Sequence, residues 1–294
     1  MKIAMIGLGD IAEKAYLPVL AAQPDLELHL CTRNKDTLDR IGDAHRVTGR
    51  STAVSGAVEA GVDAAFVHAA TAAHFAIVEP LLRAGVPVYL DKPITFDLAS
   101  STELVRLAAE SGVSLMVGFN RRVAYAELAG LPRDLVLMQK NRAHLPDEPR
   151  RAVFDDFIHV VDTLRFLAPG EVTSRHIRTR VRDGLIEHIV LELAGEGFSA
   201  IGIMNRVGAV SEESCEVMGA GAKRRIVNLG DVTDYSAEGE TLRRRPDWVP
   251  VSRQRGIEQL CLEFLDAVRQ GRVLDASDAL VSHEICEEIV RHAS

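Results

Sequence analysis

A short apolar strand that runs directly into a glycine-rich turn is the feature that most limits the fold of this chain. Residues 1–6 have the pattern of a buried strand, the turn is Gly7-Leu8-Gly9-Asp10-Ile11-Ala12, and a helical pattern follows it. In such a G-x-G-x-x-A turn, Gly7 permits the tight bend, Gly9 lets a pyrophosphate approach the backbone, and Ala12 lets the helix pack closely on the strand. Free N–H groups at the helix N-terminus favour an anion. The motif predicts a dinucleotide-binding loop, with a simple tight turn as the alternative.

Asp10 complicates this interpretation, because its negative charge lies near the same phosphates. Asp is also one of the residues preferred at helix N-caps. We expect Asp10 to be the N-cap of the helix.

The composition fits a protein of two domains. The chain has 294 residues, of which 47% are hydrophobic, so it can build sizeable cores. Its net charge of −8 argues against a broad nucleic-acid-binding surface. No stretch approaches the roughly 18 apolar residues of a transmembrane helix, and the N-terminal apolar run is too short for a signal peptide. We therefore expect neither nucleic acid nor a membrane as a partner.

The four cysteines indicate a reducing compartment. Cys31, Cys215, Cys261 and Cys286 lie far apart and form no C-x-x-C pair. This spacing predicts neither a metal site nor a disulfide framework. Reduced thiols are typical of the cytoplasm, which is the location we expect.

The first 120 residues alternate short apolar runs with helical segments. Strands are expected over residues 26–31, 63–68, 86–90 and 114–117, and helices over 71–84 and 98–111. This alternation indicates βαβ units, a parallel sheet and, with right-handed crossovers, a doubly wound fold. Ligands of such sheets bind at the carboxyl ends of the strands. We predict a Rossmann domain over residues 1–119.

The pattern changes after residue 122. Helices are expected over residues 155–167, 256–270 and 277–291, and strands over 173–182, 185–194, 198–206, 214–219 and 225–229. Successive strands separated by Gly and polar residues indicate a mainly antiparallel sheet. We predict a second α/β domain over residues 120–294 with a large, open-faced sheet. Because few helices cover it, the open face is a candidate interface for a homodimer or homotetramer.

A lysine follows the expected strand 86–90, in the sequence Asp91-Lys92-Pro93. Beside a dinucleotide loop, Lys92 can stabilise a developing alkoxide or relay a proton. The alternative is an exposed loop lysine before a turn proline.

A carboxylate and a histidine occur four residues apart in the expected helix 155–167, as Asp155 and His159. This spacing puts both on one face of a helix, where a His with a nearby carboxylate can act as general acid or base. The alternative is a helix acid beside a buried, hydrogen-bonded His. Further along, Asp162 and Arg165 are expected to form a structural ion pair.

The end of the second expected strand bears on the choice of dinucleotide. An Asp that binds the ribose at this place favours NAD, but the sequence here is Cys31-Thr32-Arg33-Asn34. Arg33 can stack on an adenine and pair with a 2′-phosphate, and Thr32 can donate to that phosphate. The sequence therefore favours NADP over NAD.

Together these segments resemble the Gfo/Idh/MocA family of NAD(P)-dependent oxidoreductases over nearly the whole chain. Residues 7–12 match the family's nucleotide loop, and residues 91–93 match its E-K-P motif. Asp155, His159 and Asp162 match its D-x-x-x-H-x-x-D signature. Within the family the chain looks most similar to the MviM, or virulence factor, subgroup. That similarity lies in residues 66–68, 91–93, 116–122 and 155–163.

The resemblance also implies the site residues. Lys92 would hold the substrate hydroxyl beside the nicotinamide, and His159 would take or give the proton. Asp155 would orient the substrate or His159, and which of Lys92 and His159 is the base stays open. The implied cofactor contacts are Gly7, Leu8, Gly9, Asp10, Ile11, Thr32, Arg33, Ala70, Thr71, His74, Asp91, Lys92 and Asn120.

The chain departs from the family pattern at several positions. Asp91 replaces the usual Glu, residues 69–71 replace a frequent Thr-Pro-Asn, and Phe157 replaces a common Gly. Arg150 and Arg151 stand in place of a glycine-rich stretch. If either arginine faced the pocket, an acidic substrate would be favoured, but we expect both to face solvent.

The leading function is hydride transfer between NAD(P) and a hydroxyl or carbonyl carbon of a sugar, polyol or related small molecule. A redox-assisted glycosidase with tightly bound NAD is one alternative. A non-catalytic NAD(P)-binding sensor is another. The presence of Lys92, Asp155 and His159 favours an enzyme, because a sensor has no need of all three.

Overall fold

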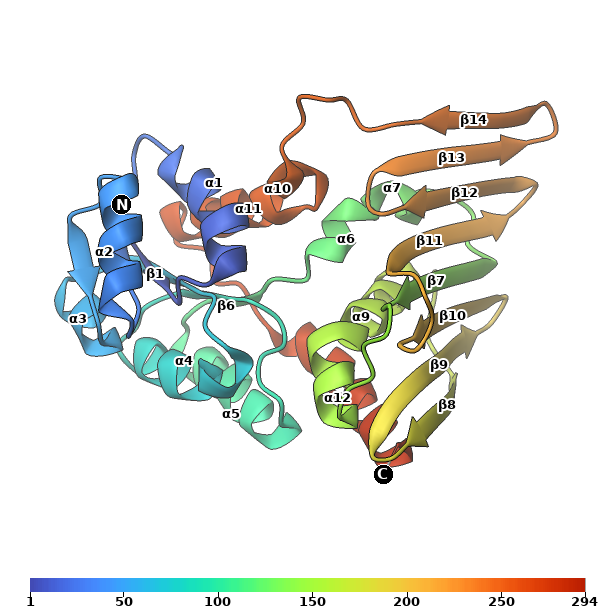
Figure 1. The fold of residues 1–294 in the computed structure, drawn as a ribbon, viewed down its shortest axis with the longest axis horizontal. Helices are drawn as coiled ribbons and strands as arrows, with labels where there is room; N and C mark the ends of the chain where they lie inside the picture. The colour runs from blue at the N-terminus through green and yellow to red at the C-terminus, as the bar shows by residue number, and fades with distance from the viewer. Residues whose placement is uncertain (294) are drawn as a thin grey trace. The chain divides into compact units, whose positions relative to one another are not determined.

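The computed structural model describes residues 1–293, which form two compact units (Figure 1). The first unit holds residues 1–118, 251–253 and 257–280, and the second holds 119–250, 254–256 and the chain from residue 281 onward. This division differs from the predicted one, in which all of 120–294 belonged to the second domain. Phe264 explains the difference, because its ring packs against Phe66 and Tyr89 of the first unit at centroid distances of 5.1 and 5.8 Å.

A six-stranded parallel sheet forms the centre of the first unit, in the order β3-β2-β1-β4-β5-β6. The strands are β1 (Lys2–Ile6), β2 (Glu27–Cys31), β3 (Gly49–Ser51), β4 (Ala64–Val67), β5 (Val88–Leu90) and β6 (Leu115–Val117). Every residue of β4 and β5 is buried, as continuous apolar runs in a parallel sheet require. The predicted parallel, doubly wound sheet is confirmed, whereas β3 was not predicted.

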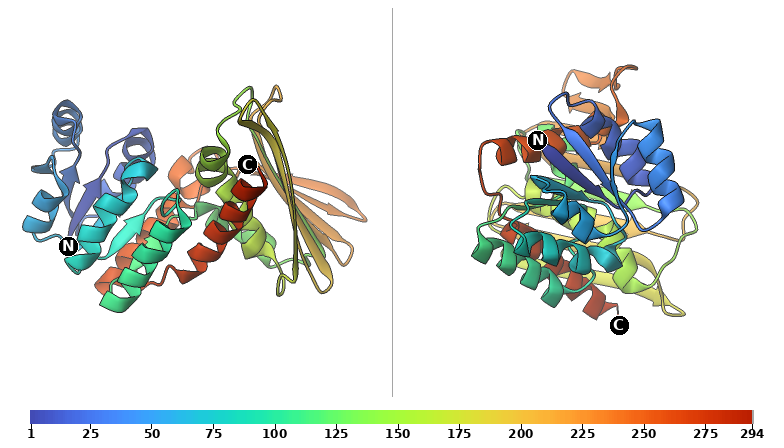
Figure 2. Two further views of the ribbon diagram at one scale, coloured as in Figure 1. Left: turned by 90° about the horizontal axis from the view of Figure 1, so that it is seen from below. Right: turned by 90° about the vertical axis from the view of Figure 1, so that its left-hand side faces the viewer.

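Helices cover both faces of this sheet (Figure 2). They are η1 (Ala12–Tyr16), α1 (Leu17–Ala21), α2 (Lys35–Ala44), α3 (Val54–Glu59), η2 (Thr71–Ala73), α4 (His74–Arg83), α5 (Leu98–Ser111) and α11 (Ile257–Arg269). The short helix α10 (Val251–Gln254) lies where the chain passes from one unit to the other. Helices α2 and α3 fall in a stretch for which the sequence predicted no element.

An eight-stranded sheet forms the second unit, in the order β14-β13-β12-β11-β7-β10-β9-β8. The strands are β7 (Leu135–Asn141), β8 (Ser174–Arg182), β9 (Leu185–Gly195), β10 (Phe198–Asn205), β11 (Glu212–Gly219), β12 (Ala222–Val227), β13 (Asp231–Ser236) and β14 (Gly239–Arg243). All neighbours pair antiparallel except β7 and β10, which are parallel. The mainly antiparallel sheet is therefore confirmed.

Helices cover only one face of this second sheet within residues 1–293 (Figure 2). They are α6 (Asn120–Ala124), α7 (Ala126–Ala129), α8 (Pro149–Arg151), η3 (Ala152–Phe157), α9 (Ile158–Leu167) and α12 (Ser277–His292), whose first four residues belong to the first unit. Helix α9 packs on β7 and β10. It can approach closely because β10 carries Gly202, where a Cβ would lie 2.3 Å from Val160.

The second unit differs from the predicted elements in several places. The helix expected from residue 155 begins at Pro149 and includes the π-helical turn η3. The strand expected over 225–229 ends at Val227, because Asn228 and Leu229 adopt positive φ angles of 48° and 60°. Strands β7, β13 and β14 were not predicted. No helix in the described chain is long and apolar enough to span a membrane.

Candidate active site

The glycine-rich loop contains one glycine that the fold requires and one that faces open space. Gly7 has a φ of 86°, and a Cβ there would lie 2.4 Å from the backbone nitrogen of Ala69. Only glycine fits such a position. A Cβ on Gly9 would meet no atom within 4 Å. The loop therefore leaves room at Gly9 for a ligand to approach the backbone.

Asp10 is not the helix N-cap that we expected. The N–H of Glu13 donates to the carbonyl oxygen of Gly9 at 3.0 Å. The first helical hydrogen bond therefore starts at Gly9, one residue before Asp10. The Asp10 carboxylate is exposed and pairs with Lys14 at 2.6 Å, one turn further along the helix. Gly9 occupies the capping position because it leads the chain out of the loop, and the carboxylate of Asp10 faces solvent.

A cavity of about 630 Å³ opens above this loop at the carboxyl ends of the parallel strands. Its lining consists of residues 6–9, 31–34, 52–54 and 68–70, with Thr37, Ala73, Ala76 and Ile77. Six predicted cofactor contacts line it: Gly7, Leu8, Gly9, Thr32, Arg33 and Ala70. Asp10, Ile11, Thr71, His74, Asp91 and Lys92 lie outside that lining, and Asn120 belongs to the second unit. Position and size both suit a dinucleotide in a doubly wound sheet.

The cavity lining carries one positive charge and no carboxylate among the described residues. Arg33 is exposed at its rim and supplies that charge. Asn34 accepts the N–H of Thr37 through Oδ1 at 3.0 Å and so caps α2. The start of α2 therefore lies beside Arg33, and both features favour an anionic group at this end of the cavity.

At the other end of the cavity, His68 has a buried imidazole that the sequence did not single out. Neither ring nitrogen has a hydrogen-bond partner within residues 1–293, and the ring of Tyr16 lies 3.9 Å away between centroids. The Nδ1 atom lies 3.7 Å from the Asp91 carboxylate, which is too long for a hydrogen bond. Buried polar nitrogens normally have partners, so His68 offers unused hydrogen-bonding capacity at the cavity wall.

Asp91 connects His68 to the lysine motif. Burial alone would raise the pKa of Asp91, but His68 and Lys92 together hold it below its ordinary value. The Oδ1 atom of Asp91 accepts the backbone N–H of Lys92 at 2.9 Å. The carboxylate thus stays ionised and fixes the backbone at Lys92.

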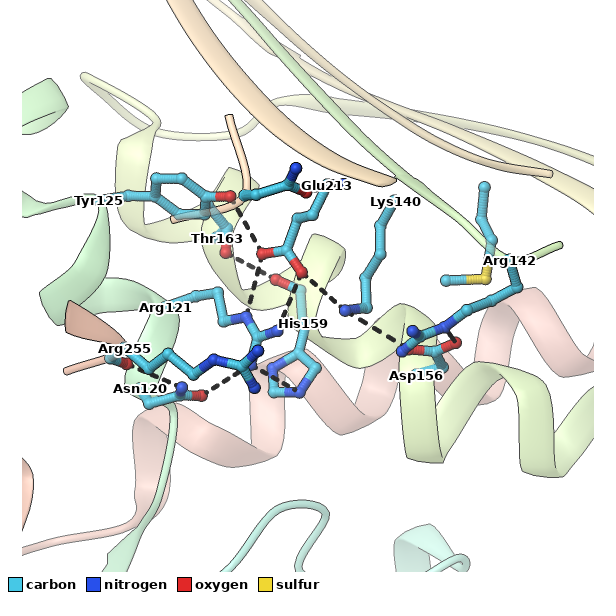
Figure 3. Close-up of polar contacts among 12 residues, drawn as sticks. Asn120, Arg121, Tyr125, Lys140, Arg142, Asp156, His159, Thr163, Glu213 and Arg255 are labelled. Carbon is cyan, nitrogen blue, oxygen red and sulfur yellow. Dashed lines mark hydrogen bonds and ion pairs between the residues drawn. The ribbon is translucent and has the colours of Figure 1, made fainter. Parts of the chain in front are cut away.

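In the second unit, His159 is buried on α9 beside a guanidinium (Figure 3). Nη1 of Arg121 lies 3.3 Å from Nε2 of His159. Because a guanidinium can only donate, Nε2 must accept, and the imidazole is neutral in this arrangement. The same Nη1 donates to Oδ1 of Asn120 at 3.1 Å. Nε2 of His159 is therefore engaged by Arg121.

Glu213 of β11 anchors that guanidinium. Its two oxygens accept from Nε and Nη2 of Arg121 at 3.1 and 2.9 Å, from the Tyr125 hydroxyl at 3.0 Å and from Nζ of Lys140 at 2.7 Å. Burial would raise the pKa of Glu213, but Arg121 and Lys140 hold it far below its usual range. Sequence reasoning missed this cluster, because it joins Arg121 to a carboxylate 92 residues away.

Asp156 forms the second carboxylate of the cluster. It accepts two hydrogen bonds from Arg142, both at 2.6 Å, and one from Nη1 of Arg206 at 2.9 Å. Nζ of Lys140 lies 3.6 Å away. Burial would raise the pKa of Asp156, but these cations lower it to about 2.

Comparisons with known proteins agree with this geometry. Residues 1–119 match a family model described as "Oxidoreductase family, NAD-binding Rossmann fold". The chain is 31% identical to "Putative oxidoreductase YceM" of Salmonella typhimurium, over 100% of this chain and 98% of that protein. A dehydrogenase (MviM) structure from Clostridium difficile matches with a TM-score of 0.93 at 27% identity, over 99% of each chain.

The chain belongs to the Gfo/Idh/MocA family of oxidoreductases. It is also 31% identical to the myo-inositol dehydrogenase Hyg17 of Streptomyces leeuwenhoekii, over 63% of this chain and 59% of that protein. The chain is therefore an oxidoreductase, and the family is one that binds NAD through its Rossmann fold.

Several residues of the family motifs have structural partners. The His74 ring contacts three carbonyl oxygens, those of Pro93 at 2.9 Å, Ile94 at 3.1 Å and Ala69 at 2.9 Å. It thereby joins the segment after Lys92 to the end of β4. The ring lies behind the cavity wall rather than in its lining.

The signature helix places neighbouring acids in different surroundings. Asp155 is half-exposed and lies 3.8 Å from Nε of Arg151, while the adjacent Asp156 is buried in the charged cluster. Asp162 lies 4.0 Å from Arg165, as expected for an ion pair. Its shorter contacts are two hydrogen bonds that it accepts from Arg122, at 2.6 and 2.9 Å.

Three departures from the family pattern lie outside the lining of the cofactor cavity. Phe157 is fully buried in the core of the second unit. Arg150 pairs with Glu287 through two hydrogen bonds of 2.7 and 2.8 Å and stacks over Phe154. Arg151 is mostly exposed, at 67% of its side chain. The predicted exposure therefore holds for Arg151, while Arg150 is held by Glu287.

Proposed function

We propose that this family member transfers a hydride between a bound nicotinamide dinucleotide and a hydroxyl-bearing carbon of a sugar, polyol or related small molecule. The observation that carries the proposal is the cavity at the glycine-rich loop, where open space lies beside the backbone of Gly9. The dinucleotide, when bound, supplies or accepts the hydride. We propose that residues 7–9, 32–33 and 70 hold it, with the first unit as cofactor domain and the second as substrate domain.

We propose that Lys92, His159 and Asp155 act on the substrate. Lys92 donates a hydrogen bond to the reacting oxygen and stabilises negative charge on it. His159 exchanges the proton with the reacting oxygen, for which the substrate must replace Arg121 at Nε2. Asp155 orients the substrate hydroxyl or His159. These roles rest on the family signature.

Hydride transfer can be tested before the substrate is known. The protein is incubated with a small-molecule extract and reduced cofactor carrying deuterium at its transferable position, and deuterated products are sought by mass spectrometry. We expect label on a carbon of a polyhydroxy compound. Lys92→Ala and His159→Ala should each slow labelling about a hundredfold or more, while cofactor affinity is unchanged. Labelling by either variant at the wild-type rate would contradict the role assigned to that residue.

We further propose that the dinucleotide is NADP. The cavity end at residues 31–34 presents Arg33, Thr32 and the start of α2, and a carboxylate for the ribose hydroxyls is missing from its described lining. A 2′-phosphate complements this charge pattern. Arg33→Ala should weaken NADPH binding about tenfold and NADH binding by much less, because only NADPH carries the 2′-phosphate.

We also propose a homodimer, or a homotetramer, that assembles through the uncovered face of the second sheet. Ile203, Ile201 and Leu137 lie on that face, and Ile203 remains 37% exposed. A second copy would bury these side chains. The four free, buried cysteines agree with a cytoplasmic location.

A further inference from the structure

A second cavity, of about 210 Å³, lies in the second unit next to the charged cluster. Arg121, Lys140, Arg142 and Arg255 line it, together with Glu213 and Asn228 among others. Figure 3 shows Arg121, Lys140 and Arg142 arranged around the two carboxylates of the cluster. Since Arg121 also contacts His159, a ligand in this cavity would lie one side chain away from that imidazole.

The cluster beside this cavity carries excess positive charge. Its four cations are Arg121, Lys140, Arg142 and Arg206, and its two buried carboxylates are Glu213 and Asp156. The half-exposed Asp147, 3.8 Å from Arg206, reduces the excess from two charges to one. At the cavity edge, Arg255 adds a further positive charge, while the Glu212 carboxylate bonds Gln139 and Asn141 on the opposite face of the sheet. The excess charge lies on Arg142, whose side chain is 36% exposed, so an anion from outside the chain can reach it and complete the site.

The hydrogen bonds inside the cluster leave donors rather than acceptors unused. Each oxygen of Glu213 already accepts two hydrogen bonds. In contrast, Nη1 of Arg142 and the whole guanidinium of Arg255 make no hydrogen bond within the described chain. Asn228 uses only its Oδ1, and Ser211 uses its oxygen as an acceptor, so an amide N–H₂ and a hydroxyl proton also remain.

We propose that this cavity binds the anionic group, a carboxylate or a phosphate, of a small polyhydroxy substrate. Arg142 and Arg255 donate to the anion, and Lys140 adds its charge. The inference rests on the proposed function, which it narrows from polyols in general to acidic or phosphorylated ones.

The arginines and the lysine that line this cavity differ from the arginines that the sequence suggested for an acidic substrate. Arg150 and Arg151 were the candidates for an acidic substrate, and neither lines this cavity. The cations that do so come from α6, β7, the strand end at Arg142 and the turn after α10.

Three compounds with the same six-carbon chain test the proposal: gluconate, sorbitol phosphate and neutral sorbitol. Their affinities for the full-length protein are measured by calorimetry, with and without saturating NADPH. We expect at least one of the two anions to bind about tenfold more tightly than sorbitol. Preference for gluconate identifies a carboxylate as the group recognised, and preference for sorbitol phosphate identifies a phosphate.

Two matched arginine variants locate the effect. Arg255→Gln should weaken binding of the preferred anion about tenfold. It should not disturb the fold, because the Arg255 guanidinium makes no hydrogen bond within the described chain. Arg253→Gln removes the same charge two residues away, on an exposed side chain outside the cavity lining, and should leave affinity unchanged. Equal affinity for all three compounds, or equal effects of the two variants, would overturn the proposal.

The same protein samples separate this inference from the proposed function. A protein that binds NADPH but shows no anion preference overturns the anion site alone. A protein that binds the anion but no nicotinamide dinucleotide overturns the proposed function and leaves an anion-binding cavity.

Discussion

At the scale of single residues, the loop glycines illustrate two different requirements. Gly7 is fixed by the fold, because its positive φ and the backbone of Ala69 exclude any side chain. Gly9 is not fixed by the fold, since a Cβ there meets only open space. If that space belongs to a pyrophosphate, the requirement for glycine at Gly9 comes from the ligand.

Alanine substitutions separate these requirements. Gly9→Ala should keep the thermal unfolding temperature of the protein and weaken NADPH binding about tenfold or more. Gly7→Ala should lower both stability and affinity, because strain at φ 86° is added to a backbone clash. Gly130→Ala, at a glycine with open space and negative φ, is the control and should change neither. Normal NADPH affinity in Gly9→Ala would argue against a phosphate at the loop.

At the scale of elements, local signals explain which predictions were accurate. Helix α5 has the predicted bounds, because Asp97 caps it by accepting the N–H of Ser100 and Gly112 ends it with a φ of 64°. Strand β7 was missed although it alternates buried and half-exposed residues, since its pattern ends in Gln139, Lys140 and Asn141. Of these, Lys140 belongs to the charged cluster, whereas Gln139 and Asn141 bond Glu212 on the opposite face of the sheet.

The charged site itself was only partly predictable. His159, which Arg121 contacts, was singled out from a motif within the sequence. Arg121, Lys140 and Glu213 were not, because what joins them is the register of β7 with β11, where Lys140 pairs with Glu213. Antiparallel pairing of strands some 70 residues apart leaves no short-range trace in a sequence.

The π-helical turn η3 leads to a prediction about pH. Asp156 has a pKa lowered to about 2, so its ion pairs contribute stability that is complete above its ordinary pKa of 3.8 and is lost as the pH falls toward 2. The shift corresponds to about 2 kcal/mol. Asp156→Asn should therefore unfold more easily at pH 7 and approach the wild-type stability near pH 2, as followed by urea denaturation. Asp155→Asn, one residue away and half-exposed, is the control and should follow the wild-type curve.

At the scale of the whole molecule, each unit supplies what the other lacks. The first unit contains the cavity suited to a dinucleotide, and the second contains the histidine, the charged cluster and the sheet with one uncovered face. The fold class and the family membership could both be inferred from the sequence. The placement of α11 in the first unit could not, because it depends on how Phe264 packs against Phe66 and Tyr89.

The uncovered sheet face leads to a prediction about assembly. The wild-type protein should be a dimer or tetramer by light scattering. Ile203→Glu should dissociate it, because a carboxylate would be buried in the interface. Val273→Glu places the same charge on an exposed position of the first unit and should leave the assembly intact. A monomeric wild-type protein would contradict this use of the face.

The central claim is that the cavity in front of Gly9 binds a nicotinamide dinucleotide. Titration of the full-length protein with NADPH and with NADH, followed by nicotinamide fluorescence, tests it most directly. We predict saturable binding of both, with NADPH about tenfold tighter because of Arg33. Binding of neither dinucleotide would contradict the claim, and tenfold tighter binding of NADH would contradict the preference for NADP.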